Sequence, residues 1–213
     1  MKRCAIFLSL LLLFSFSGCQ KAYYSTMESV GYDKREIMTD RVEDARESQE
    51  EAKEQFASAL EQFKSAVAFD GGELEKIYEK LDDEYEDSED KAEDVRKHID
   101  KVEDVAEALF EEWAEEITEY SSSKLRVASQ KKLTATKNRY NELIRAMRKA
   151  EKKMYPVLAA FKDQVLYLKH NLNAQAIAAL EGELSTINSD VEALIKEMDK
   201  SIAEADSFIQ SLE

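Results

Sequence analysis

The chain has 213 residues, of which 35% are charged, and a formal net charge of −15 at pH 7. Five glycines and one proline in a sequence rich in Ala, Glu, Lys and Leu are typical of long helices or a coiled coil. Aliphatic residues recur too regularly for a disordered acidic chain. The acidic balance argues against nucleic acid or anionic lipid as the general partner.

The N-terminus has the layout of a secretory signal peptide. A short positive start precedes an apolar run over residues 4–16, and two small residues, ending with Gly18, stand directly before Cys19. The run is shorter than the ~20 residues of a transmembrane helix. Its end resembles a bacterial lipobox, with cleavage between Gly18 and Cys19, although Phe16 stands where Leu is usual. An uncleaved anchor and an ordinary signal peptide with a chance cysteine are the alternatives.

This pattern predicts three parts of the chain: a signal peptide over 1–18, a lipidated tether over 19–32 and a single elongated helical domain over 33–213. Acylation of Cys19 makes the membrane the first expected partner and leaves no thiol for a disulfide. Gln20 stands where an Asp usually marks retention at the inner membrane. The predicted location is therefore the cell envelope, facing the periplasm, with the outer membrane favoured over the inner.

Heptad seams predict about four long helices. Apolar residues alternate three and four positions apart over four stretches, 38–66, 74–113, 133–168 and 177–212. Asp33 is the expected N-cap of the first helix, and glycines 71–72, serines 121–123 and the segment 170–175 separate the rest. Short connections make consecutive helices antiparallel. The predicted fold is all-α, an elongated antiparallel bundle or coiled coil of about four long helices.

Three features depart from the regular seams. The acidic segment 82–94 (DDEYEDSEDKAED) has almost no apolar stripe and is predicted to be a loosely packed, solvated part of the second helix. Pro156 removes a backbone donor, which predicts a kink or a break between Lys152 and Pro156. Four aromatic side chains of the third helix are expected to fill its seam: Tyr140, Tyr155, Phe161 and Tyr167.

Charge is distributed unevenly along the chain. Residues 70–119 hold 22 acidic and six basic residues, whereas residues 124–153 hold eleven basic and two acidic ones. Because these stretches lie on consecutive antiparallel helices, pairing between them is favoured. The alternative is a functional basic tip at the hairpin, which would contact anionic headgroups or an envelope polymer. Its residues would be Lys124, Arg126, Lys131 and Lys132.

The joint between the third and fourth helices carries polar residues with two interpretations. They cap helix ends, or they form a docking corner for a partner; the four are Lys169, His170, Asn171 and Asn173. No pattern of catalytic chemistry accompanies them. The chain lacks a phosphate-binding glycine loop, and its two histidines stand alone, as surface or helix-end residues, without metal-ligand spacing. The sequence therefore indicates no catalytic residue, metal, cofactor or small-molecule substrate, and a protein that is not an enzyme.

Several segments resemble one family: SVGYDKREI (29–37), RVEDARESQEEAKEQFASALEQFK (41–64), RYNELIRAMRKAEKKMYPVLAAFKDQVLYLKHNLNAQAIAALEGEL (139–184) and SIAEADSFIQSL (201–212). They are similar to an uncharacterised family of proteobacterial coiled-coil lipoproteins, domain of unknown function 2959. The resemblance implies an exported, lipid-anchored helical protein and assigns no site residue.

The function expected from these observations is that of a non-enzymatic envelope lipoprotein. It would be a membrane-anchored helical rod that serves as a structural or protein-interaction module, with an envelope protein or a second copy of the chain as its partner. The alternative is binding of anionic lipid or an envelope polymer through the basic hairpin tip.

Overall fold

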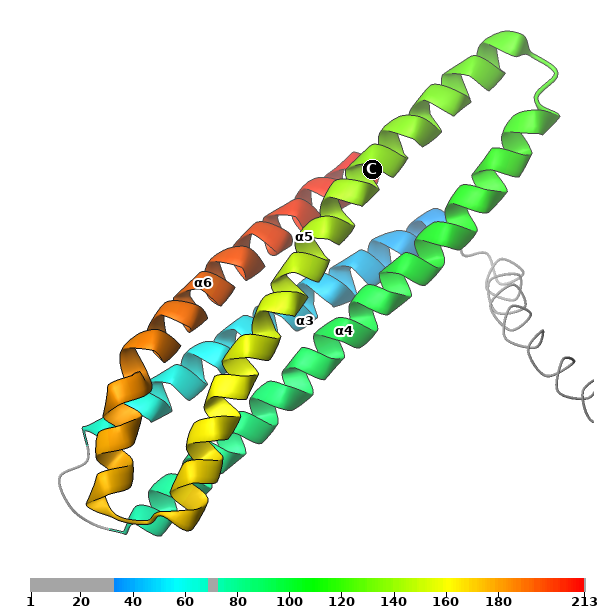
Figure 1. The fold of residues 1–213 in the computed structure, drawn as a ribbon. Coiled ribbons are helices and arrows are strands. Elements are labelled where there is room, and N and C mark those ends of the chain that lie inside the picture. Colours follow the sequence, from blue (N-terminus) through cyan, green and yellow to red (C-terminus); the bar gives the residue numbers. More distant parts are fainter. Residues whose placement is uncertain (1–32, 69–72, 213) are drawn as a thin grey trace, which may run out of the picture.

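The computed structural model describes residues 33–68 and 73–212. These residues form four helices: α3 (Lys34–Val67), α4 (Leu74–Glu119), α5 (Ser123–His170) and α6 (Ala174–Leu212). Consecutive helices run antiparallel, and α6 packs beside α3, so that each helix packs mainly against two neighbours around one long core (Figure 1). The predicted all-α antiparallel bundle is confirmed. The predicted signal peptide, the predicted tether and the predicted glycine cap at 71–72 lie outside the described residues.

The core is built from the predicted heptad positions. Phe56 and Phe63 of α3 stack on Phe161 of α5, with ring centroids 6.2 and 4.7 Å apart, and all three rings are fully buried. Burial of large apolar side chains along the seam is the main source of stability in such a bundle. At the start of α3, Asp33 accepts a hydrogen bond from the backbone N–H of Arg35 at 2.9 Å, which confirms the expected N-cap.

The acidic segment 82–94 packs more closely than predicted. Tyr85, Ser88 and Ala92 are buried and continue the seam between Leu81 and Val95. Hydrophobic periodicity did not indicate this buried stripe, because Ser88 is polar and Ala92 is small. Ser88 donates to the carbonyl of Glu84 at 2.7 Å, so its hydroxyl is satisfied inside the helix. The prediction of a loosely packed stretch is wrong for this face, whereas the remaining carboxylates are largely solvent-facing.

Pro156 does not break α5. The helix runs from Ser123 to His170 with Pro156 inside it. The proline lies on the exposed side of the helix, as does Lys152, whose carbonyl loses its usual donor. Water can therefore hydrate that carbonyl, and the buried seam on the opposite side, with Met154 and Val157, holds the helix together.

Unequal helix lengths give the bundle an overhang. The α4 and α5 helices have 46 and 48 residues, compared with 34 in α3 and 39 in α6. The α4–α5 hairpin therefore projects past the beginning of α3 and the end of α6 (Figure 1). None of the helices in the described part of the chain is long and apolar enough to span a bilayer.

Candidate functional site at the hairpin tip and the opposite corner

The hairpin tip is a short turn held by side-chain hydrogen bonds. Ser122 is the N-cap of α5 and accepts a hydrogen bond from the backbone N–H of Leu125 at 3.4 Å. Arg126 donates from Nη2 to the carbonyl of Tyr120, the C-cap residue of α4, at 2.7 Å. Arg126 therefore has a structural role in closing the hairpin, because it satisfies a carbonyl at the end of α4.

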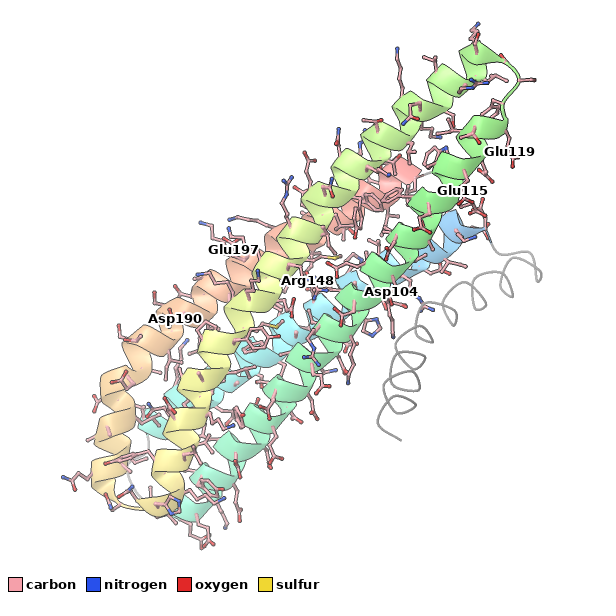
Figure 2. All side chains as sticks on the ribbon, turned by 45° about the vertical axis from the view of Figure 1, so that its right-hand side comes forward. Asp104, Glu115, Glu119, Arg148, Asp190 and Glu197 are labelled. Carbon is pink, nitrogen blue, oxygen red and sulfur yellow. The ribbon has the colours of Figure 1, made fainter. Side chains whose placement is uncertain are left out.

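The other three predicted tip cations are exposed. Along the described ranges, no carboxylate lies within ion-pair distance of Lys124, Lys131 or Lys132. Figure 2 places Glu115 and Glu119 on the last turns of α4, beside this basic arm. From residue 113 to residue 132 the three acidic and four basic side chains leave a net charge of only +1. The tip is therefore not a strongly basic surface, although single cations are available on it.

The tip also exposes apolar side chains that the heptad analysis did not single out. Tyr120 is 39% exposed, Leu125 55% and Val127 56%. All residues from 123 to 132 except Ser129 are exposed, because neither α3 nor α6 extends far enough to cover them. The sequence could have indicated these residues through the difference in predicted helix length. Apolar residues that lie beyond the ends of the shorter helices are expected to be exposed.

The base of the tip ties it to the start of the folded domain. Lys34, the first residue of α3, forms an ion pair with Glu112 of α4 at 3.0 Å. Trp113 donates from Nε1 to the hydroxyl of Ser129 at 2.9 Å, and the Arg35 guanidinium lies 5.8 Å from the Trp113 ring centroid. The chain therefore enters the bundle at the end from which the tip projects.

Further along the bundle, one cation of the basic stretch, Arg148, pairs with the acidic helix α4. Arg148 of α5 donates to Glu103 and Asp100 of α4 and, at 2.9 Å, to Glu151 of its own helix. Its position between the helices is visible in Figure 2. The hydrogen bonds to Glu103, followed by those to Asp100 and Glu151, raise the pKa of Arg148. The predicted pairing of α5 with α4 is thus confirmed at Arg148, whereas Lys149 pairs with Glu197 of α6 at 2.8 Å.

At the opposite end, the asparagines of the α5–α6 corner cap helices. The Asn171 side chain donates from Nδ2 to the carbonyl of Tyr167 at 2.9 Å. Asn173 accepts hydrogen bonds from the backbone N–H groups of Gln175 and Ala176 at 2.9 and 3.2 Å, which opens α6. The predicted capping is confirmed for both asparagines.

The corner nevertheless exposes apolar side chains beside basic ones. Leu166 is 47% exposed, Tyr167 42% and Leu172 43%, next to the exposed side chains of Lys169 and His170 in the last turn of α5. The prediction that Tyr155 and Tyr167 fill the seam is wrong, because Tyr155 is also 48% exposed. Phe161 is buried as expected, and Tyr140 packs edge-on against Phe110 at 5.4 Å.

Groups suited to metal binding do not gather within the described ranges, where no three His, Cys, Asp or Glu side chains are placed to hold an ion. His98 is half-buried rather than on the surface or at a helix end, which corrects its predicted position. Burial, reinforced by Lys101, lowers the pKa of His98, and its Nδ1 has no hydrogen-bond partner among the residues that the structure describes.

Comparison with known proteins gives one match. A family model described as a protein of unknown function, DUF2959, matches residues 23–212. Curated proteins and solved structures gave no significant match to this chain.

Proposed function

The chain belongs to the DUF2959 family of proteins of unknown function, and we propose that it acts as a non-enzymatic lipoprotein of the bacterial cell envelope. In this proposal the acylated Cys19 holds a helical rod at the membrane, and the far end of the rod presents a docking surface to an envelope protein. Gln20 favours the periplasmic face of the outer membrane as the location.

The observation that carries the proposal is the placement of the two ends. The chain enters α3 at the tip end, where Lys34 pairs with Glu112, whereas the α5–α6 corner lies at the other end of the bundle (Figure 1). The 48 residues of α5 alone span about 70 Å. A protein attached to a membrane through residues before Asp33 would therefore hold the corner far from that membrane.

The chemistry of the corner indicates what kind of partner would dock there. Leu166, Tyr167 and Leu172 provide apolar contact area, and an aromatic side chain with a polar end is a frequent anchor in protein interfaces. Lys169 and His170 border this surface on α5. The partner would thus offer an apolar patch bordered by carboxylates, since complementary charge at the rim favours the correct partner.

Attachment to the membrane is tested by changing the predicted acylation site. The Cys19→Ser variant should accumulate as an unprocessed full-length precursor, and [³H]palmitate should label the native chain but not the variant. Normal processing and fractionation of Cys19→Ser would contradict the lipoprotein proposal.

Docking at the corner is tested by photo-crosslinking in living cells. A photoreactive residue in place of Leu172 should give one discrete protein adduct, and the same probe in place of Asp190, an exposed position on the side of α6, should not. Leu166→Lys should abolish the Leu172 adduct while leaving the protein folded and membrane-bound. Equal labelling from both positions, or an adduct that survives Leu166→Lys, would refute a docking surface at the corner.

A further inference from the structure

The α4–α5 hairpin tip combines three features that no other part of the described surface brings together. It exposes Tyr120, Leu125 and Val127, it carries lysines beside them, and it projects from the end at which the chain enters the bundle. We propose that the tip is an amphipathic wedge that inserts into the surface of the same membrane to which the N-terminus is attached. This inference rests on the membrane attachment proposed above.

The direction of the side chains favours insertion by the end of the hairpin. Leu125 and Val127 lie in the first turns of α5, where every Cα–Cβ bond leans toward the helix N-terminus. Both side chains are thus directed toward the tip, although they lie on different faces of the helix. Tyr120 closes α4 on the other side of the turn, and Tyr is a residue that prefers the membrane interface.

The dimensions of the overhang suit this placement. The first buried residue of α5 is Leu133, ten residues after Ser123, so the exposed part of the helix is about 15 Å long. Interfacial elements bury their apolar side chains about 5–10 Å into the boundary between headgroups and acyl chains. The fourteen residues from Cys19 to Tyr32 can span at most about 50 Å, so a lipid on Cys19 can reach the membrane that the tip enters.

The charge of the tip indicates which force drives the contact. Lys124, Lys131 and Lys132 can reach lipid phosphates. Together with Arg126 they give four positive charges, which the three glutamates between residues 113 and 132 reduce to a net charge of +1. Attraction to an anionic surface is therefore weak, and burial of the apolar side chains dominates. Binding by the wedge should persist in zwitterionic lipid and at high salt, in contrast to binding by a basic tip.

A second copy of the chain is a poorer occupant of the same surface. A stable protein interface buries about 800 Å² on each partner. Three partly exposed side chains supply only a fraction of that area, and apart from Ala128 the remainder of the segment 120–132 consists of serines, one glutamine and charged residues. A membrane contact needs much less area when a covalent lipid already holds the protein at the surface, because the second contact is then intramolecular.

The experiment uses Trp113, the single tryptophan of the chain, as its starting point. Protein purified from membranes, with its N-terminus as the cell leaves it, is reconstituted into phosphatidylcholine vesicles with or without brominated acyl chains. A Trp113→Phe background carries one new tryptophan, from Val127→Trp at the tip or from Tyr155→Trp at a similarly exposed aromatic position far from it. Circular dichroism verifies that both variants keep the helical content of the native chain.

The wedge predicts that brominated lipid quenches the tryptophan at position 127 several-fold more than the one at position 155. This difference should persist in 0.5 M salt, a concentration at which the Debye length is only about 4 Å. Flotation of the protein with equal quenching at both positions would overturn the wedge while leaving the anchor intact. Quenching that requires anionic lipid and low salt would also overturn it, in favour of electrostatic binding.

Two other results are equally decisive. Failure of the protein to float with the vesicles would refute the proposed attachment and the wedge together. Protection of the tryptophan at position 127 from aqueous iodide, without quenching by brominated lipid, would show that a second copy covers the tip and would likewise overturn the wedge.

Discussion

Gln49 is the side chain whose replacement should stabilise this bundle. It lies on α3, is fully buried, and neither Oε1 nor Nε2 has a hydrogen-bond partner among the described residues. Ser201 of α6 has a buried hydroxyl in the same condition. The ion pairs Arg46–Asp206 at 3.6 Å and Lys53–Asp199 at 3.1 Å lie on either side of this polar layer.

The magnitude follows from the cost of an unsatisfied buried group. Leaving one buried donor or acceptor without a partner costs about 1–3 kcal/mol. Gln49→Met keeps a similar volume and removes both polar atoms, so the free energy of unfolding should rise by about 2 kcal/mol. For a chain of this length each kcal/mol raises Tm by about 2–4 °C, which gives an increase of about 4–8 °C.

The assay is thermal and urea unfolding followed by circular dichroism, with Gln55 as the matched control on the same helix. Gln55 donates from Nε2 to the Glu84 carboxylate at 2.8 Å, so Gln55→Met should lower stability by about 1 kcal/mol. Opposite signs for the two substitutions are the expected result. A loss of stability in Gln49→Met would show that the buried amide is satisfied in solution, and the reasoning would then be wrong.

Three further predictions concern stability and are read from urea unfolding midpoints. Arg148→Met should cost about 2 kcal/mol, because it removes hydrogen bonds between charged groups and leaves the buried Glu151 carboxylate without its cation. Arg145→Met, at an exposed position, should change stability by less than about 0.5 kcal/mol. Equal effects of the two substitutions would contradict this. Hydrogen bonds from lysines of α5 and α6 lower the pKa of Glu197 to about 2. The contribution of the Glu197 carboxylate to the free energy of unfolding is therefore present above the ordinary pKa of 4.5 and is lost as the pH falls toward 2. Between these pH values the Glu197→Gln variant should lose less stability than the native chain. The same loss of stability in both proteins would show that Glu197 does not have this role. Phe161→Ala should cost about 3–5 kcal/mol through loss of its two ring contacts, and Tyr155→Ala on the exposed side much less.

The fold was predictable because each helix carries its own periodic signal. The α6 seam alternates three and four positions apart from Ile177 to Leu212, and its buried members include Leu180, Ile187, Val191 and Leu194. The segment 82–94 was misjudged because a close approach of helices can bury Ser88 and Ala92 in place of large apolar residues. Periodicity identifies a seam only when its members are apolar.

The candidate sites were less predictable, for a different physical reason. Whether Leu125 and Val127 are exposed depends on where α3 and α6 end. The positions of these two residues within α5 do not indicate where the other helices end. The same holds for Tyr155 and Tyr167, which occupy the outer side of α5. The sequence identified the capping asparagines and the exposed lysines because capping and charge are local properties.

The charges of the tip are arranged against the stability of its own helices. The last turn of α4 holds Glu116 and Glu119 and no basic residue, and the first turn of α5 holds Lys124 and no acidic residue. Each such charge at the wrong helix end costs about 0.3–1 kcal/mol through the helix dipole. Arg126 offsets part of this cost by its hydrogen bond to the end of α4. A zwitterionic headgroup layer offers phosphate to the lysines and ammonium to the glutamates, so this arrangement supports the proposed membrane contact of the tip in neutral as well as anionic lipid.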